Sequence, residues 1–219
     1  MIPKKFKYKL FGRFRGRKKN HYMVYQHLDK YNVNIKLDID KKQYNILDIG
    51  SGSGESTLYL SSKHINSKII TCELFKDGNI NLCNEINKNE IENIRLFQGN
   101  VLEFLDKIDS ESIFDEIWIL FPDPWPKVRH HKRRLINNKF LKKIYLYLKY
   151  KGKIIMASDS ESYIHSIGKT IYDLQSLYVW ENQSVEQWTY GYLDLPITKF
   201  YKKALKSNKN TMFFKIHKI

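Results

Sequence analysis

The sequence predicts an α/β protein with a mostly parallel, doubly wound sheet and helices on both of its faces. Three observations lead to this prediction. Short apolar runs alternate with amphipathic segments along most of the chain, which is the order of βαβ units with right-handed crossovers. A glycine-rich turn follows the first of these runs. Polar residues end four successive runs, at the edge where open α/β sheets bind their ligands.

Strands and helices follow one another in the order that such a sheet requires. We expect strands at five apolar runs, residues 44–50, 68–74, 94–98, 113–121 and 153–157. Helices are expected at residues 21–30, 56–63, 77–89, 138–149 and 160–174, with a short amphipathic stretch at 101–108. The aromatic-rich end of the chain is predicted to add strands that close the sheet, with a loop near residues 190–210 between them.

The length of 219 residues suits one sizeable domain with its own core. A hydrophobic fraction of 42% argues against global disorder. Neither an internal repeat nor a linker is visible, so we predict a basic N-terminal tail over residues 1–19 and a single domain over residues 20–219. The tail interleaves cations with Phe and Tyr; it either orders on a phosphate backbone or is a plain disordered tail.

Targeting signals and metal-binding patterns are missing from the sequence. No apolar run is long enough to span a bilayer, and the basic N-terminus is not followed by an apolar core and a cleavage site. The two cysteines, Cys72 and Cys83, make neither a disulfide framework nor a zinc site. We therefore expect a reduced, cytoplasmic protein that uses no metal, no membrane and no obligate protein partner.

The net charge of +15 is concentrated in three segments. Residues 1–19, 127–143 and 199–219 hold 24 of the 38 basic residues and no Asp or Glu. If the fold brings these segments together, they form an electrostatic footprint for a polyanion, and nucleic acid is the favoured partner. Three solvated surfaces that only aid solubility, or contact with an anionic membrane, are the weaker alternatives.

A loop with three closely spaced glycines joins the first strand to the following helix. In Asp48-Ile-Gly-Ser-Gly-Ser-Gly54, glycines at Gly50, Gly52 and Gly54 allow a tight turn and a close approach to a ligand. The spacing differs from that of dinucleotide-binding folds, and no Gly-Lys-Ser/Thr completes a phosphate loop. Alone the pattern is weak, because any tight turn between a strand and a helix could use it.

Polar residues at the next strand ends strengthen the interpretation of a ligand site. Glu73 ends the second strand, where an acid hydrogen-bonds ribose hydroxyls in nucleotide-binding sheets. Asn100 and Asp123 follow the third and fourth strands. Each residue alone is better explained as a helix cap or turn residue, but together with Asp48 they favour binding. Acids and amides without a phosphate cradle suit S-adenosylmethionine, whose sulfonium favours nearby carboxylates.

The stretch of residues 121–134 places one carboxylate next to a dense run of cations. Asp123 lies between two prolines, which stiffen the loop, and beside Trp125. Trp125 either stacks on a base or packs against the loop. The cations beyond it are expected to hold nucleic-acid phosphates: Lys127, Arg129, Lys132, Arg133 and Arg134. A proline-rich turn followed by a solvated basic helix is the simpler alternative.

With these residues in view, the chain resembles the class I methyltransferases, and more closely the bacterial tRNA (guanine-N7-)-methyltransferase family. The motifs that carry the resemblance are Leu47-Asp-Ile-Gly-Ser-Gly-Ser-Gly-Glu55, Cys72-Glu-Leu-Phe-Lys76, Phe121-Pro-Asp-Pro-Trp-Pro-Lys127, Arg129-His-His-Lys-Arg-Arg134, Ala157-Ser-Asp159 and Thr198-Lys-Phe200. Many methyltransferases share the glycine loop, whereas the proline-rich motif and the basic motif after it are highly specific. The resemblance implies a Rossmann-like fold and methylation of N7 of a variable-loop guanine, usually guanine-46, in tRNA.

The resemblance also implies roles for individual residues. Carried over by position, the cofactor contacts are Asp48, Gly50, Glu73, Asn100 and Asp123. The substrate contacts are Lys127, Asp159 and the segment that begins at Thr198 and includes Tyr201. Two positions depart from the family: Asp48 stands where Glu is common, and Tyr201 replaces the Glu of a Thr-x-x-Glu motif. The second change puts in doubt how a carboxylate there would grip the base, although Thr198 can still donate a hydrogen bond.

Asp123 is the predicted catalytic residue. Guanine N7 carries a lone pair and no proton at neutral pH, so attack requires no general base. Placement of N7 in line with the methyl group is expected to supply most of the catalysis, and a fixed carboxylate can stabilise the positive charge that develops on the base. Two alternatives remain open: an adenine N6 methyltransferase, which uses related acid-proline-aromatic motifs, and a non-catalytic RNA-binding protein on the same scaffold.

Overall fold

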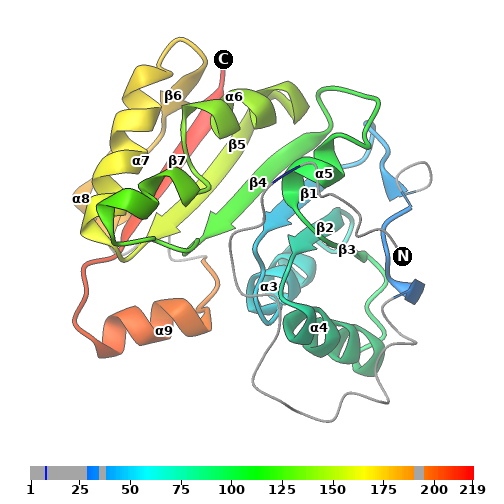
Figure 1. Cartoon of the computed structure of the whole chain (residues 1–219). Helices are drawn as coiled ribbons and strands as arrows, with labels where there is room; N and C mark the ends of the chain where they lie inside the picture. Colours follow the sequence, from blue (N-terminus) through cyan, green and yellow to red (C-terminus); the bar gives the residue numbers. More distant parts are fainter. Residues whose placement is uncertain (1–7, 9–28, 35–37, 190–194) are drawn as a thin grey trace, which may run out of the picture.

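The computed structural model describes Tyr8 and residues 29–34, 38–189 and 195–219. Seven strands form one sheet in the order β3-β2-β1-β4-β5-β7-β6 (Figure 1). The strands are β1 (Asn45–Ile49), β2 (Lys68–Glu73), β3 (Ile94–Gln98), β4 (Phe114–Leu120), β5 (Leu148–Ser158), β6 (Tyr178–Trp180) and β7 (Met212–Lys218). Strand β7 runs antiparallel to β5 and β6, while the pairs among β1 to β5 are parallel. The mostly parallel sheet predicted from the sequence is confirmed.

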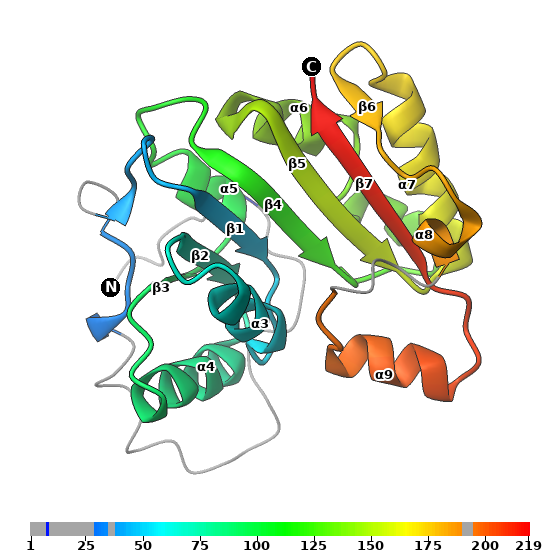
Figure 2. The ribbon, with the colours of Figure 1, turned by 180° about the vertical axis from the view of Figure 1, so that it is seen from behind.

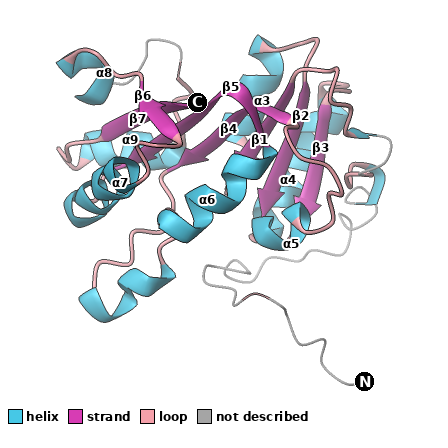
Figure 3. Ribbon diagram, turned by 90° about the horizontal axis from the view of Figure 1, so that it is seen from above, coloured by secondary structure: helices cyan, strands magenta, loops and turns pink. Residues whose placement is uncertain are grey.

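Helices lie on both sides of the sheet (Figure 3). They are α3 (Glu55–Lys63), α4 (Lys76–Lys88), α5 (Val101–Leu105), the 3-10 helix η1 (Val128–Arg133), α6 (Asn138–Tyr147), α7 (Glu161–Asp173), α8 (Val185–Thr189) and α9 (Lys199–Lys206). Because successive side chains of a strand point to opposite faces, neighbours such as Ile46 and Leu47 belong to two separate hydrophobic cores. One core contains the apolar faces of α5, α6 and α7, and the other those of α3 and α4.

Three boundaries differ from the sequence-based expectations. Helix α6 ends at Tyr147, and β5 already begins at Leu148, five residues before the expected start. Lys151, with φ of 58°, and Gly152 sit inside this strand, where the register against β4 shifts, so the connection expected between the helix and the strand is a bulge within the strand. The loop expected near residues 190–210 was wrong, because it contains helix α9.

The N-terminal predictions fall largely outside the described residues. Of the expected basic tail over residues 1–19, only Tyr8 is described, and its hydroxyl donates a hydrogen bond to Asp106 at 2.7 Å. Only the last two residues of the expected helix at 21–30 are described, and both are helical. Among the described residues, no helix is both long and apolar enough to cross a membrane.

Candidate active site

The carboxyl ends of β1, β2, β4 and β5 meet along one edge of the sheet. Strand β1 pairs with β2 through Ile49 and Cys72, and β4 pairs with β5 through Leu120 and Ala157. The residues that follow these pairs include Gly50, Glu73, Asp123 and Asp159. Helix α9 lies beyond the same strand ends in two opposite views (Figure 1 and Figure 2). The fold therefore gathers the polar residues that the sequence placed at successive strand ends.

The glycine loop between β1 and α3 has a backbone that favours glycine. Gly50, Gly52 and Gly54 have φ values of 77°, 60° and 92°, in the left-handed region that side chains disfavour. The amide of Gly50 donates to the carbonyl of Cys72 at 2.8 Å, which ties the start of the loop to β2. A Cβ atom on Gly50 would meet nothing within 4 Å. The loop therefore leaves open space beside its backbone, as close approach by a ligand requires.

Glu73 joins the end of β2 to the glycine loop. Its carboxylate accepts hydrogen bonds from the amides of Gly52 and Phe75, both at 2.7 Å. Burial raises the pKa of Glu73 above its ordinary value, and the negative charge of Asp123 adds to this rise. Strands β2 and β4 both pair in parallel with β1, so the residues that follow them lie at the same edge of the sheet. Two acids thus face one site from different strands.

Gly78 in the first turn of α4 is a site residue that the sequence analysis missed. A Cβ atom at this position would lie 1.8 Å from the carbonyl oxygen of Gly52 and 2.9 Å from the ring of Phe75. The helix therefore packs directly against the backbone of the glycine loop. The signal was available in the sequence, because a glycine inside a predicted helix costs stability unless close packing requires it.

Asp48 is almost completely buried beneath the loop, with 1% of its surface exposed. Its Oδ2 atom accepts hydrogen bonds from the hydroxyls of Ser56 and Thr57, both at 2.6 Å. Burial raises the pKa of Asp48 to about 6, although these hydrogen bonds oppose the rise. In the structure this carboxylate therefore connects β1 to the first turn of α3.

Asn100 has the helix-capping role that the sequence analysis weighed against ligand binding. It is the N-cap of α5, and its Oδ1 atom accepts a hydrogen bond from the amide of Leu102 at 2.8 Å. The residue is partly exposed at the end of β3. Glu73 pairs with Gln98 in the sheet, so Asn100 is two residues beyond the partner of Glu73.

The proline-rich loop after β4 presents Asp123 at the surface. Two of its residues, Phe121 and Trp125, have φ values of 51° and 44°, which are unusual for bulky side chains. Asp123 is exposed, yet partial desolvation raises its pKa above the ordinary value. Trp125 packs edge-on against His130 at 5.9 Å, and the Arg133 guanidinium lies 4.9 Å from its ring centre. Trp125 therefore contributes to the packing of its own loop.

The expectation that every cation of the basic motif holds RNA phosphates is wrong for Arg134, which is buried. It is 4% exposed, and its Nε atom donates to the carbonyl of Pro124 at 2.9 Å. Its two terminal nitrogens donate to the carbonyl and hydroxyl of Ser162, at 2.9 and 2.7 Å. The guanidinium also lies 4.9 Å from the ring centre of Tyr163. Arg134 therefore fastens the proline-rich loop to the start of α7, while Lys127, Arg129 and Lys132 are exposed.

Helix α9 connects the glycine loop with the proline-rich loop. Thr198 is its buried N-cap, and its hydroxyl oxygen accepts from the amide of Tyr201 at 3.2 Å. The Tyr201 ring stacks on Phe121 at 6.0 Å and meets Phe213 edge-on at 5.5 Å. On the other side, Lys199 lies 3.2 Å from the Ser53 hydroxyl and 3.5 Å from the Glu55 carboxylate. The sequence analysis found two of these residues but not the helix that holds them.

The remaining predicted substrate residues lie at the same edge. Asp159 directly follows β5 and forms an ion pair with Lys209 at 2.9 Å. Lys127 is exposed and precedes η1 as its N-cap residue. Within the part of the chain that the structure describes, no group of three His, Cys, Asp or Glu residues could hold a metal ion.

Comparison with known proteins agrees with this geometry. A family model described as "Putative methyltransferase" matches residues 42–214. The tRNA (guanine-N(7)-)-methyltransferase of Wolbachia pipientis wMel is 32% identical over 213 residues, which cover 95% of this chain and 92% of the relative. The enzyme of the same name from Leptospira interrogans serogroup Icterohaemorrhagiae serovar copenhageni is 31% identical over 167 residues, covering 76% and 75% of the two chains.

Solved structures share the fold at low sequence identity. A putative methyltransferase from Streptococcus mutans, in complex with SAH, has a TM-score of 0.54 and 13% identity, and covers 93% of this chain and 100% of its own. NSun6 from Pyrococcus horikoshii, with SFG, has a TM-score of 0.59 and 15% identity, and covers 81% and 48%. The family model, the long alignments and the fold lead to one conclusion: the chain belongs to the tRNA (guanine-N7-)-methyltransferase family of the class I methyltransferases.

Proposed function

We propose that the protein transfers a methyl group from S-adenosylmethionine to N7 of guanine-46 in the variable loop of tRNA. The observation that carries this proposal is the parallel pairing of β1 with β2 and β4, which brings Glu73, Asp123 and an open glycine loop to one sheet edge. Exposed cations flank that edge at Lys127, Arg129 and Lys132. A polyanionic substrate is therefore attracted to the place where the carboxylates lie.

The residues around the glycine loop fit S-adenosylmethionine. Gly50 leaves room for the ligand, and Glu73 has carboxylate oxygens at the position where nucleotide-binding sheets hold ribose hydroxyls. Asn100 and Asp123 complete the set from the ends of β3 and β4. Asp48 acts from below, by holding the first turn of α3 under the loop. When bound, the cofactor supplies an electrophilic methyl group and leaves as S-adenosylhomocysteine.

Asp123 is the residue best placed to act on the target base. Its carboxylate is exposed on a loop that two prolines and Arg134 hold in place. A fixed negative charge there stabilises the positive charge that develops on guanine when N7 is methylated, and it can also accept hydrogen bonds from N1 and N2 of the base. Because N7 is not protonated, the chain has to position the base rather than remove a proton.

The tRNA contacts are assigned to residues around this carboxylate. Lys127 and the exposed cations of η1 hold phosphates, which positions the RNA without reading its sequence. Asp159, Thr198 and Tyr201 line the approach from β5 and α9. Tyr201 offers a ring and a hydroxyl where the family has a carboxylate, so we assign it to packing at the rim of the base site.

The reaction is tested by incubating the protein with an unmodified tRNA transcript and methyl-labelled S-adenosylmethionine, followed by identification of the modified nucleoside. We expect 7-methylguanosine, and we expect it to disappear when guanine-46 of the transcript is replaced by adenine. N6-Methyladenosine would instead indicate an adenine methyltransferase. Absence of any product with an active cofactor-binding protein would indicate an RNA-binding protein on a methyltransferase scaffold.

The role of Asp123 is tested with Asp123→Asn, which keeps the shape of the side chain and removes its charge. We expect kcat to fall by about 100-fold or more, while the Kd for tRNA changes less than about twofold because the phosphate contacts remain. Asp109→Asn, a matched change of an exposed acid outside the site, serves as the control. Normal turnover in Asp123→Asn would remove this carboxylate from the mechanism.

A further inference from the structure

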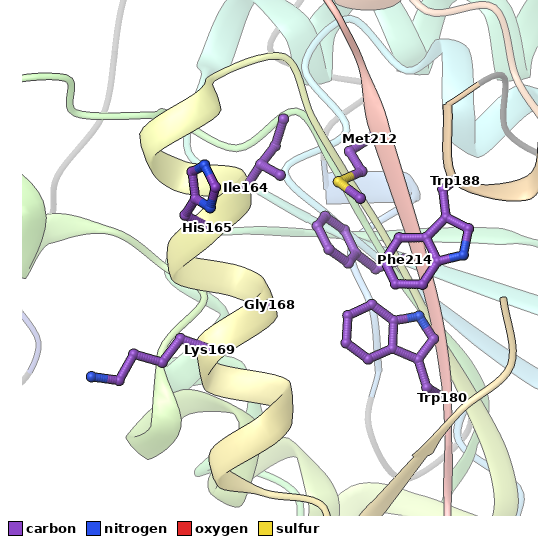
Figure 4. A pocket seen from close by; sticks show the side chains of 8 residues that line it. All are labelled: Ile164, His165, Gly168, Lys169, Trp180, Trp188, Met212 and Phe214. Carbon is purple, nitrogen blue, oxygen red and sulfur yellow. The ribbon is translucent and has the colours of Figure 1, made fainter. Parts of the chain in front are cut away.

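A second, partly open groove lies between α7 and the aromatic residues of β6, β7 and α8 (Figure 4). Its volume is about 300 Å³, at the lower end of the range for ligand pockets, which runs from about 300 to 1,000 Å³. The residues that line it are Ile164, His165, Gly168, Lys169, Trp180, Trp188, Met212 and Phe214. None of the residues assigned above to cofactor or substrate is among them.

One wall of the groove is a rigid aromatic surface. The rings of Trp180 and Trp188 lie 4.5 Å apart at an angle of 31°, and Phe214 packs against both. The indole nitrogen of Trp180 donates to Asn182 at 3.0 Å, which fixes the orientation of its ring. Flat rings held in this way are the usual surface on which proteins stack unpaired bases.

The opposite wall is helix α7, where Gly168 has no side chain that would fill the groove. Gly168 lies inside the helix, where glycine costs about 1 kcal/mol relative to alanine. Packing does not require it, because a Cβ atom at Gly168 would meet nothing within 4 Å. This differs from Gly78, where a Cβ atom would collide with backbone. The glycine at position 168 therefore lowers helix stability without allowing closer packing, and it leaves space open in the groove.

Among the eight lining residues, Lys169 carries a positive charge and none carries a negative charge. His165 and Lys169 are exposed on α7, and no carboxylate is among the eight lining residues. In Figure 4 the Lys169 side chain points outward from the aromatic wall, at the outer side of the helix. This long, exposed side chain can turn toward the mouth of the groove and meet the anionic group of a ligand whose flat ring lies inside.

The groove begins at the same sheet edge as the candidate active site. Met212 pairs with Ser158, the residue before Asp159. Helix α7 starts at Glu161, next to Ser162, to which Arg134 is bonded. A bound RNA that places a base near Asp123 and phosphates on η1 therefore has a short path to this groove.

We propose that the groove binds an unstacked nucleobase of the RNA substrate, with the ring on the tryptophan wall and the adjoining phosphate at His165 and Lys169. The proposal rests on the proposed function for its substrate, and it adds a second point at which the protein holds that substrate. An apolar peptide would make no use of the exposed His165 and Lys169, whereas a nucleotide stacks its base on the tryptophan wall and offers its phosphate to these two side chains.

The test compares two substitutions at Gly168 in the full-length protein. Gly168→Leu fills the groove, and Gly168→Ala is the matched control that adds one methyl group in open space. We expect Gly168→Leu to raise the Kd for an unmodified tRNA transcript about tenfold, the size of one lost stacking contact, and to leave kcat at saturating tRNA unchanged. Photo-crosslinking of the wild type to the transcript is expected to label the peptides that contain Trp180 or Trp188.

A second variant keeps the test decisive if Gly168→Leu unfolds. Lys169→Glu is a surface change that we expect to raise the Kd for tRNA, compared with Lys41→Glu, a charge reversal at an exposed residue before β1. Unchanged tRNA affinity in a folded Gly168→Leu, or equal effects of the two charge reversals, would overturn the proposal. A changed oligomeric state with unchanged RNA affinity would overturn it too, because it would assign the groove to a protein contact. Wild-type protein that forms no 7-methylguanosine refutes the proposed function instead, so the two failures are distinguishable.

Discussion

The two loops that form the candidate site reach a fixed shape by opposite means. The glycine loop after β1 uses residues that can adopt many conformations, and Glu73 holds it through a backbone amide. The proline-rich loop after β4 uses stiff residues, and the buried side chain of Arg134 holds it through the carbonyl of Pro124. One anchor accepts hydrogen bonds with a negative charge and the other donates them with a positive charge.

The two anchors also differ in whether they are proposed to bind a ligand themselves. Glu73 anchors its loop and is also a proposed cofactor ligand, so a change there affects both functions at once. Arg134 is 4% exposed and anchors a loop whose proposed ligand-binding residue is Asp123. The anchor of the proline-rich loop can therefore be altered without touching a proposed ligand, and the glycine loop has to be altered through the residues that pack behind it.

The largest effect is expected from Gly78→Ala, which acts on the glycine loop from behind. The added Cβ atom would lie 1.8 Å from the carbonyl oxygen of Gly52, and backbone cannot move aside as a flexible side chain can. We expect a loss of more than about 3 kcal/mol in the free energy of unfolding and weaker binding of S-adenosylhomocysteine, measured by urea unfolding and calorimetric titration.

Gly168→Ala is the matched control for this prediction. The same methyl group in α7 meets nothing within 4 Å, so alanine should raise stability by about 0.5–1 kcal/mol through its helix propensity. Equal effects of the two substitutions would show that helix propensity alone decides both, and that α4 does not press on the glycine loop.

A smaller effect, of opposite sign, is expected from Asp48→Asn. The pKa of Asp48 rises from 3.8 to about 6 on folding, so the folded chain binds this proton more tightly than the unfolded chain. Stability from this group is therefore highest below about pH 4, falls as pH rises toward about 6 and stays low above it. Asparagine can still accept from Ser56 or Thr57 without the buried charge, and it should recover up to roughly 3 kcal/mol at pH 7.5.

The measurement for Asp48→Asn is urea unfolding at pH 4, 5, 6 and 7.5. Between pH 4 and 6 the free energy of unfolding of the wild type should fall as the Asp48 contribution is lost. The free energy of unfolding of the variant should change less with pH over the same range. Glu73→Gln is the informative comparison, because its amide group cannot accept from both Gly52 and Phe75 and so should loosen the loop. If the free energy of unfolding changed with pH in the same way in wild type and Asp48→Asn, burial would not raise the pKa of Asp48 as inferred.

Arg134→Met is expected to act on the proline-rich loop alone. Loss of the guanidinium removes the donor to the carbonyl of Pro124 and the two hydrogen bonds to Ser162, which should cost about 2 kcal/mol of stability. The loop then holds Asp123 less firmly, so we expect kcat to fall about tenfold with an unchanged Kd for S-adenosylhomocysteine. The combination of lower kcat and intact cofactor binding identifies a positioning residue.

Arg129→Met provides the control within the same motif. Arg129 is exposed, so its loss should weaken tRNA binding and lower the salt dependence of that binding, with no change in stability. If Arg134→Met behaved in the same way as Arg129→Met, the two cations would share a role in RNA binding. The assignment of Arg134 as the buried anchor of the proline-rich loop would then be wrong.

The sequence predicted the sheet and the strand-end residues because both follow from local patterns. Apolar runs, glycines and prolines mark where strands begin and end, and parallel strands necessarily bring their carboxyl ends together. The contact partners of Arg134 and Gly78 could not be predicted in the same way. Each depends on a residue distant in the chain, Ser162 for the arginine and Gly52 for the glycine, and the packing of helices on the sheet decides those contacts.

Helix α9 shows the same limit at a smaller scale. The sequence analysis expected a loop here, although residues 199–206 carry four lysines that alternate with apolar and aromatic residues. The Thr198 cap and the aromatic contacts of Tyr201 with Phe121 and Phe213 stabilise the helix. Two of those contacts are tertiary, and one of them reaches the proline-rich loop itself.

The smallest effect is expected at Tyr201, where the two loops meet through α9. Tyr201→Phe keeps the ring between Phe121 and Phe213, so stability and kcat should change little, by less than about 0.5 kcal/mol in either free energy. Tyr201→Glu introduces the carboxylate that the resemblance leads us to expect at this position, but it removes an aromatic partner, at a cost of about 1 kcal/mol. Urea unfolding and tRNA methylation kinetics of both variants separate two explanations of this position. A gain in kcat for Tyr201→Glu would show that a carboxylate at this position improves catalysis. A loss of both stability and kcat would show that the main role of Tyr201 is to hold α9 against Phe121.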